Sequence, residues 1–186
     1  NQRFQTTSGY LSAYTIDLPI ISDTNSFINS YRYKVWKELY SENVTSFSFT
    51  AKSAFSLKRE DIKLSERLVT SENNLRGFEV GKVGPKDGSD FVGGNYLTAF
   101  NVSTTLPQVM PSLQNSDFFL FFDVANIWGV DYDSSIDDSN SIRSSVGLGV
   151  DWFTPIGPMN FSFSQPISKE DSDVTESFRF NIGTSF

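Results

Sequence analysis

The chain ends with Ser177-Phe178-Arg179-Phe180-Asn181-Ile182-Gly183-Thr184-Ser185-Phe186, in which aromatic or aliphatic side chains alternate with polar ones. A period of two residues is that of a β-strand, and one face of this strand is wholly apolar. A strand of this kind that finishes on a C-terminal aromatic is typical of the closing strand of a transmembrane β-barrel. The alternative is the edge strand of a soluble sandwich, in which a second sheet would have to cover Phe178, Phe180, Ile182 and Phe186.

The composition agrees with a barrel. The chain has 186 residues, enough for one domain or for about eight membrane strands with their loops. There are 18 Phe beside 7 Tyr and 3 Trp, charged residues make up 20%, and the mean hydropathy is −0.26. Such an average is expected where an apolar outside and a polar inside cancel. No apolar run approaches the roughly 18 residues of a transmembrane helix, so a membrane-spanning helix is excluded.

The residue types that the chain lacks exclude several functions. It has no Cys and no His, which removes disulfides, the common zinc sites and the usual nucleophile and base pairs. The net charge of −7 argues against nucleic acid as a partner. We therefore expect no enzyme activity, no cofactor and no metal. The chain begins at Asn1, which is neither a start Met nor the head of a signal sequence, and this indicates a processed protein or a piece of a longer one.

Eight segments of the chain alternate in polarity, and turns or loops rich in Gly, Pro, Asn, Asp and Ser separate them. Several carry charges in mid-strand, where the core of a soluble sheet would not accept them. They predict an all-β fold, an antiparallel transmembrane β-barrel that forms one domain over residues 1–186. The expected strands are 9–19, 27–38, 44–56, 93–106, 117–128, 142–153, 159–167 and 177–186.

The connections between these strands alternate in length. The turns at 107–116 and 154–158 are shorter than the loops at 57–92 and 129–141, and in outer-membrane barrels short turns are periplasmic and long loops extracellular. The longest connection, 57–92, is unusual in a compact domain and is expected to be functional. Its many glycines predict either a flexible surface loop, which composition alone favours, or a backbone folded against another surface.

Several motifs in this order resemble the C-terminal half of the BamA family, the barrels that assemble outer-membrane proteins, within a superfamily that also includes two-partner secretion transporters. The resemblance covers nearly the whole chain and is closest over 64–186. It implies strands nine to sixteen of a sixteen-stranded barrel, without the first eight strands or the periplasmic domains. The motifs are Leu75-Arg76-Gly77-Phe78, Gly84-Pro85, Gly93-Gly94-Asn95, Phe122-Asp123, Arg143-Ser144-Ser145-Val146-Gly147, Trp152-Phe153-Thr154-Pro155-Ile156-Gly157-Pro158, Phe161-Ser162, Gln165-Pro166-Ile167 and Phe180-Asn181-Ile182-Gly183.

The resemblance implies that the loop 57–92 folds into the barrel lumen, where Arg76 of the Leu75-Arg76-Gly77-Phe78 motif pairs with Asp123 on the wall. A guanidinium in a polar lumen engages a carboxylate through two hydrogen bonds. From the residues alone, Asp123 is equally well a lumen residue solvated by water. Ser103 and Ala125 depart from the family pattern, which has a second acidic residue and a glycine there, so a weaker hold on the loop is expected.

The resemblance also implies a seam at the last strand, formed by Phe178, Phe180, Ile182, Gly183 and Phe186. Glycine weakens a strand and permits a bend, which would allow the seam to open. The resemblance implies that the exposed edge of 177–186 then pairs with an incoming unfolded strand. Thinning of the nearby bilayer would lower the insertion barrier. The alternative is that 177–186 is only the terminal recognition signal that outer-membrane barrels carry.

The leading functional hypothesis is therefore an insertase of the bacterial outer membrane that works without ATP. Its partners would be unfolded outer-membrane proteins, membrane lipid and accessory lipoproteins bound through the missing periplasmic domains. The alternative is a polypeptide translocation pore, gated by 57–92 and lined by Arg32, Lys34, Arg143 and Asp151. The carboxylates of 131–138 alternate as in a calcium loop, but the turn glycine and terminal glutamate are missing, so a solvated acidic loop is favoured.

Overall fold

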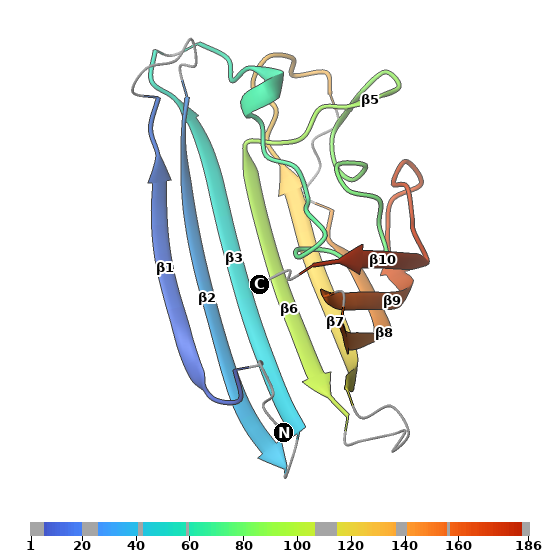
Figure 1. Cartoon of the computed structure of the whole chain (residues 1–186). Coiled ribbons are helices and arrows are strands. Elements are labelled where there is room, and N and C mark those ends of the chain that lie inside the picture. Colours follow the sequence, from blue (N-terminus) through green and yellow to red (C-terminus); the bar gives the residue numbers. More distant parts are fainter. Residues whose placement is uncertain are drawn as a thin grey trace.

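Eight long strands form one antiparallel sheet (Figure 1). The structure, a computed structural model, describes residues 6–19, 26–40, 43–58, 60–106, 115–136, 141–155 and 157–183. All eight expected strands are present, which confirms the predicted fold class. They are β1 (Gly9–Asp17), β2 (Ser26–Tyr40), β3 (Asn43–Ser56), β6 (Tyr96–Thr105), β7 (Ser116–Trp128), β8 (Arg143–Thr154), β9 (Gly157–Ser168) and β10 (Phe178–Ile182).

The strands follow one another in the sheet in chain order. Each pair of neighbouring strands is therefore antiparallel and joined by a direct connection, without a crossover. The sheet curls into a half-shell, and among the described residues β1 and β10 remain its two unpaired edges (Figure 1). Because consecutive connections alternate between the two ends, the segments after β3, β7 and β9 gather at one end. This arrangement is that of a partial barrel.

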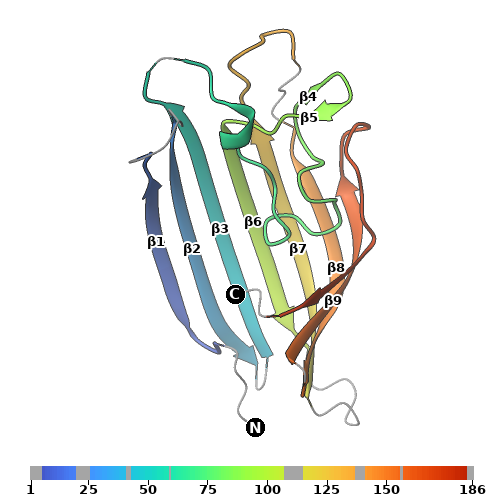
Figure 2. The same cartoon turned by 45° about the horizontal axis from the view of Figure 1, so that its top comes forward.

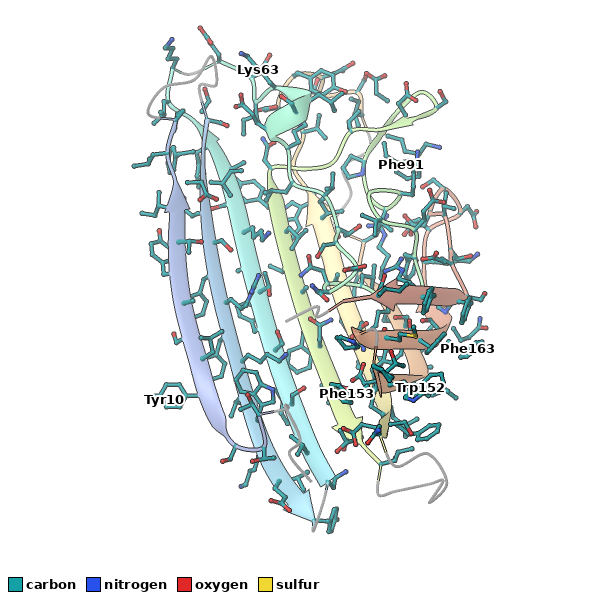
Figure 3. The ribbon with its side chains drawn as sticks, viewed as in Figure 1. Tyr10, Lys63, Phe91, Trp152, Phe153 and Phe163 are labelled. Atoms are coloured by element: carbon teal, nitrogen blue, oxygen red, sulfur yellow. The ribbon has the colours of Figure 1, made fainter. Side chains whose placement is uncertain are left out.

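The convex face of the half-shell is apolar and exposed, the reverse of a soluble protein. In Figure 3, Tyr10 and Phe163 lie at opposite sides of the sheet and point away from the hollow. No second layer covers this face among the described residues, and an apolar surface that large marks contact with lipid or protein. Its exposed members include Tyr10, Tyr14, Ile16, Tyr31, Tyr33, Phe47, Phe49, Phe55, Phe100, Leu120, Phe122, Val146, Leu148, Trp152, Phe163, Phe178, Phe180 and Ile182.

The long connection between β3 and β6 lies inside the hollow, in front of β6 and β7 (Figures 1 and 2). It contains a 3-10 turn, η1 (Leu64–Glu66), and a small hairpin of β4 (Lys86–Asp87) and β5 (Asp90–Phe91). We call residues 57–95 the long loop. The predicted strand start at residue 93 is wrong by three residues, because Gly94 pairs with Leu68 of the long loop before β6 begins.

The buried hydrophobic cluster lies between the long loop and the concave wall. The wall contributes residues of β3, β6 and β7, where alternate positions point inward and are small or aliphatic. The half-shell therefore has its core against the loop rather than against a second sheet. No helix among the described residues is long and apolar enough to cross a membrane. The cluster comprises Ile62, Leu68, Leu75, Phe78 and Val83 of the loop and Ala54, Leu97, Ala99, Ala125 and Ile127 of the wall.

Candidate functional site

The tip of the long loop meets the wall at Arg76 and Asp123. Arg76 Nε lies 2.7 Å from Asp123 Oδ2, and Arg76 Nη2 lies 2.8 Å from Oδ1, so the guanidinium engages the carboxylate through two parallel hydrogen bonds. The Arg76 backbone N–H also donates to Asp123 Oδ2 at 3.1 Å. Asp123 is fully buried on β7, whereas the Arg76 side chain keeps 21% of its surface. The carboxylate is therefore held by protein donors.

An aromatic platform lies beneath the guanidinium. The Arg76 Cζ is 3.6 Å from the centroid of the Phe121 ring, close enough for a cation–π contact. Phe121 in turn lies over Gly147 of β8, where an added Cβ would come within 2.3 Å of the ring. Glycine at 147 thus gives the ring room to lie flat and to support the guanidinium.

The backbone of the tip presses closely on the wall. Gly77 has φ +89°, and a Cβ added there would lie 3.1 Å from the Cβ atoms of Ser145 and Ser164. Ser145 Oγ donates to the Arg76 carbonyl. Asn101 Nδ2 donates to the Asn74 carbonyl and to Asp123 Oδ1, both at 2.9 Å. Small polar wall residues therefore serve the loop backbone as well as its arginine.

The remaining residues of the predicted loop contact, Leu75 and Phe78, are buried in the cluster between loop and wall. The structure thus brings Leu75, Arg76, Gly77, Phe78 and Asp123 together; their role as an anchor remains a prediction. Ser103 lines the adjacent cavity, and Ala125 packs in the apolar cluster. Asn101 supplies a further hydrogen bond to Asp123 beside these two departures from the family pattern.

A second buried ion pair fixes the loop after β9. Arg143 Nε lies 2.9 Å from Asp173 Oδ2, and both side chains are almost fully buried. Asp173 Oδ1 also accepts from the backbone N–H of Gly84 at 3.4 Å, so this carboxylate joins the wall, the last loop and the long loop. The expectation that Arg143 lines an open lumen is wrong, because two loops cover it.

A third ion pair joins the long loop to the loop after β7. Arg67 pairs with Asp131, whose Oδ2 accepts from the Ile62 backbone N–H at 3.0 Å. Burial by itself would raise the pKa of the Asp131 carboxyl, but these hydrogen bonds outweigh it and hold the pKa below its ordinary value. The acidic stretch 131–138 is therefore not simply solvated as expected, although Asp137 and Asp138 lie outside the described residues.

The predicted seam residues lie on β10, which pairs with β9 over Phe178–Ile182. Phe178 and Phe180 face outward and stack near Phe163 and Phe161, with ring centroids 4.9 and 4.8 Å apart. Gly183 follows with φ +117° and open space around its Cβ position. The other side of β10 is an unpaired edge among the described residues, and Phe186 lies outside them.

A cavity of about 610 Å³ runs along the concave face beside the loop tip. Its lining includes Arg32, Lys34 and Lys52 on β2 and β3, together with Asp151 on β8. Three of the four residues expected to line a pore, Arg32, Lys34 and Asp151, therefore line this cavity. The described residues contain no group of three or more His, Cys, Asp or Glu side chains placed to hold a metal.

An outward apolar face, a polar inward face and a loop tied into the hollow define a class of protein, the transmembrane β-barrels that carry an internal loop. The Omp85 superfamily domain matches residues 1–186, and the chain belongs to this superfamily. The family expected from the sequence motifs is thereby confirmed, and with it the location in the bacterial outer membrane.

The chain is similar to several proteins of this family. It is 30% identical over 142 residues to the outer membrane protein assembly factor BamA of Neisseria meningitidis, covering 61% of this chain and 18% of that protein. It is 29% identical over 159 residues to a SAM50-like protein of Schizosaccharomyces pombe, covering 80% and 33%. The match thus spans 18% to 33% of the length of these relatives.

The chain resembles one solved structure more closely in fold than in sequence. A crystal structure of BamA from Haemophilus ducreyi that lacks POTRA domains 1–3 superimposes with a TM-score of 0.84 at 24% identity. The match covers 97% of this chain and 39% of that one. The fold of nearly the whole chain is therefore also found as a part of that longer chain.

Sequence reasoning missed Phe121, Gly147, Asn101, Arg67 and Asp173. One signal was available for the first two. Phe119-x-Phe121 on one strand and Gly147-x-Gly149 on the next alternate with the same period, and β7 and β8 pair Phe121 with Gly147 and Phe119 with Gly149. A ring opposite a glycine on the same face is a recurrent way to fill the space that the glycine leaves.

Proposed function

We propose that the chain forms the C-terminal part of a barrel that assembles other β-barrel proteins in the outer membrane, and that the free edge of β10 receives the substrate. Bacterial relatives are named outer membrane protein assembly factors, which supports the general role. The observation that carries the seam is the weak hold on β10. Among the described residues, β10 pairs with β9 over only five residues, and Gly183, with open space around its Cβ position, directly follows it.

The chemistry of strand capture follows from this edge. An unpaired strand presents backbone N–H and C=O groups that an extended segment satisfies by adding itself to the sheet. The outward Phe178, Phe180 and Ile182 continue the lipid-facing surface to that edge, so an added strand with alternating polarity would bury its apolar side in the same layer. Free energy from strand pairing would drive the exchange, without ATP and without a covalent step.

The loop contact supports the process by fixing the wall. The pair of Arg76 and Asp123 ties the loop tip to β7, and the apolar cluster holds the loop over β3, β6 and β7. We infer that this anchor gives the half-shell a rigid side while the edge at β10 exchanges partners. Membrane lipid would contact the convex face, and accessory lipoproteins would bind the part of the full-length protein that lies beyond this chain.

A translocation pore is the second candidate, because one observation favours it. Arg32, Lys34 and Lys52 line a cavity on the concave face, and a chain passing through a lumen would meet them. The two functions place the substrate at different residues. Substrate lies beside β10 in the assembly factor and along β2 and β3 in the pore.

Cysteine crosslinking separates them, since the chain has no native Cys. In the natural full-length protein, single cysteines would replace Ile182 at the seam, Ser48 in the cavity and Leu148 on the outward middle of the sheet. Each variant is presented with an outer-membrane barrel substrate stalled before folding. We expect a crosslink at Ile182 and none at Ser48 or Leu148. Crosslinks at Ser48 with none at Ile182 would contradict strand capture and support the pore.

A further inference from the structure

Arg179 joins the seam strand to the long loop. It lies on the inward face of β10, and its Nη2 donates to the Phe78 carbonyl at 2.7 Å. Its Nε donates to Glu176 at 2.7 Å. The Arg179 side chain keeps 12% of its surface, so these bonds are largely shielded from water. One guanidinium thus connects the last strand, the residues before it and the loop tip.

Backbone contacts strengthen the same junction. Phe78 forms an antiparallel bridge with Thr175, the Glu79 N–H donates to the Val174 carbonyl at 2.9 Å, and the Glu176 N–H donates to the Gly77 carbonyl at 3.0 Å. Residues 174–176 therefore lie against the long loop immediately before β10 begins. The Gly77 and Phe78 carbonyls that accept these bonds directly follow Arg76, which is tied to Asp123.

Other support for β10 comes from β9 and from the lipid-facing side. Phe163–Phe178 and Phe161–Phe180 are outward ring pairs. Cross-strand aromatic pairs hold a strand to its neighbour, but they do not connect it to the lumen. On the inward side, Arg179 connects β10 to the long loop through the Phe78 carbonyl.

One hydrogen bond of the guanidinium, from Nη2 to the Phe78 carbonyl, depends on the docked loop. Arg179 Nη1 is buried and has no partner among the described residues. Buried donors without partners are costly, and this one is tolerated while Nη2 and Nε are satisfied. When the loop tip leaves the wall, the Phe78 carbonyl moves with it, and Arg179 loses its acceptor on the loop.

We propose that Arg179 is a positioning residue that makes the order of β10 depend on the docking of the long loop. The docked loop fixes the inward side of the strand, and undocking of the loop removes that inward support. This inference rests on the proposed seam, because it describes how that edge is controlled. It adds a control point on the lumen side to a strand whose other contacts face lipid.

Hydrogen exchange in the natural full-length protein, reconstituted in lipid without substrate, tests the coupling. The variants are Asp123→Asn, which loosens the loop from the far wall, Arg179→Gln, and the two combined. We expect each single change to accelerate exchange over 174–182 roughly fivefold. In the Arg179→Gln background, Asp123→Asn should add less than about twofold. Arg179→Lys keeps the charge near Glu176 and should restore part of the protection.

Phe180→Ala is the matched control, because it weakens β10 from the lipid side and leaves Arg179 in place. Asp123→Asn should retain its full effect in that background. An equal effect of Asp123→Asn with and without Arg179 would overturn the proposal, as would unchanged exchange in Arg179→Gln. Since no substrate is present, either failure leaves strand capture standing, whereas absence of the Ile182 crosslink with coupling intact would overturn capture alone.

Discussion

The concave face of the half-shell has two parts that follow the same strand pattern and differ in what lies over them. In the first part, the long loop covers and buries the polar residues Asp123, Ser145 and Ser164. On the part around Arg32 and Lys34 the side chains stay open to the cavity. Alternation places a residue on a face, but its environment depends on a loop distant in sequence. Side chains of similar polarity therefore have different energetic roles.

The largest expected effect comes from removing the loop's main apolar contact. Phe78→Ala should weaken docking of the long loop by about 3–5 kcal/mol, because it leaves a cavity in the cluster between loop and wall. Hydrogen-exchange protection of 62–83 in the full-length protein measures this loss. Phe91→Ala is the control, since Phe91 belongs to the same loop but lies outside the cluster, and it should cost less than about 1 kcal/mol. Equal losses would place the loop's stability elsewhere.

The second-largest expected effect comes from removing the buried charge of Asp123. Asp123→Asn should cost about 2–3 kcal/mol of loop docking, because it removes the charge partner of Arg76, whose side chain is only 21% exposed. Asp151→Asn changes a carboxylate that faces the cavity and accepts a hydrogen bond from Asn160, and it should cost less than about 1 kcal/mol. Hydrogen-exchange protection of the Leu75–Phe78 amides measures the loss of docking in both variants. A larger loss for Asp151→Asn would reverse the comparison between the two parts.

The aromatic platform gives a smaller effect. Gly147→Ala should cost about 1–3 kcal/mol, because the new methyl group would come within 2.3 Å of the Phe121 ring and 2.2 Å of the Phe163 carbonyl. Thermal unfolding of the full-length protein and exchange at the loop tip should both report it. Ser103→Ala, on the cavity side of β6, is the control, and it should change the free energy of unfolding or of loop docking by less than about 0.5 kcal/mol. Unchanged protection at Arg76 in Gly147→Ala would mean that the ring does not support the guanidinium.

The smallest effect concerns acid sensitivity at the end where the loops gather. The pKa of Asp131 is lower in the folded protein, so its contribution is present above the ordinary value near 3.8 and is lost as the pH falls through the folded value. The protection factors of the amides of 62–68, which compare observed with intrinsic exchange at each pH, should therefore fall roughly two- to fivefold between pH 5 and pH 3. Asp131→Asn should remove that dependence. A steeper acid response in the variant would contradict the role of the carboxylate.

The sequence was sufficient to predict the strands, because period-two alternation is a local property that each segment carries by itself. Six of the eight predicted strands begin within one residue of the observed ones, as at Gly9, Ser26 and Ser116; β9 begins two residues earlier than predicted, and β6 begins three residues later. The reason is long-range, since Gly94 pairs with Leu68 and is taken from the sheet. Such a boundary depends on a contact that no local pattern records.

The contents of the hollow were less predictable from residues alone. Arg76 and Asp123 came from resemblance to a family, because a lone carboxylate on an inward face is equally consistent with solvation. Arg143 was misplaced for a related reason. Its inward position followed from alternation, but its burial depends on Asp173, which is 30 positions further along the chain. Pairings between loops and wall leave no periodic signal.

The arrangement of the core has a consequence for the order in which the chain is completed. The long loop precedes its partners, since Arg76 lies 47 positions before Asp123 and Phe78 lies 101 positions before Arg179. Contacts at such separations form late, because closing a long chain segment costs entropy before the contact returns any free energy. During synthesis the loop can reach its main wall partner only after Asp123 of β7 has been made, and it reaches β10 only after Arg179. A chain that stops before β7 would therefore leave Leu75 and Phe78 without part of their wall and exposed to the cell's proteases.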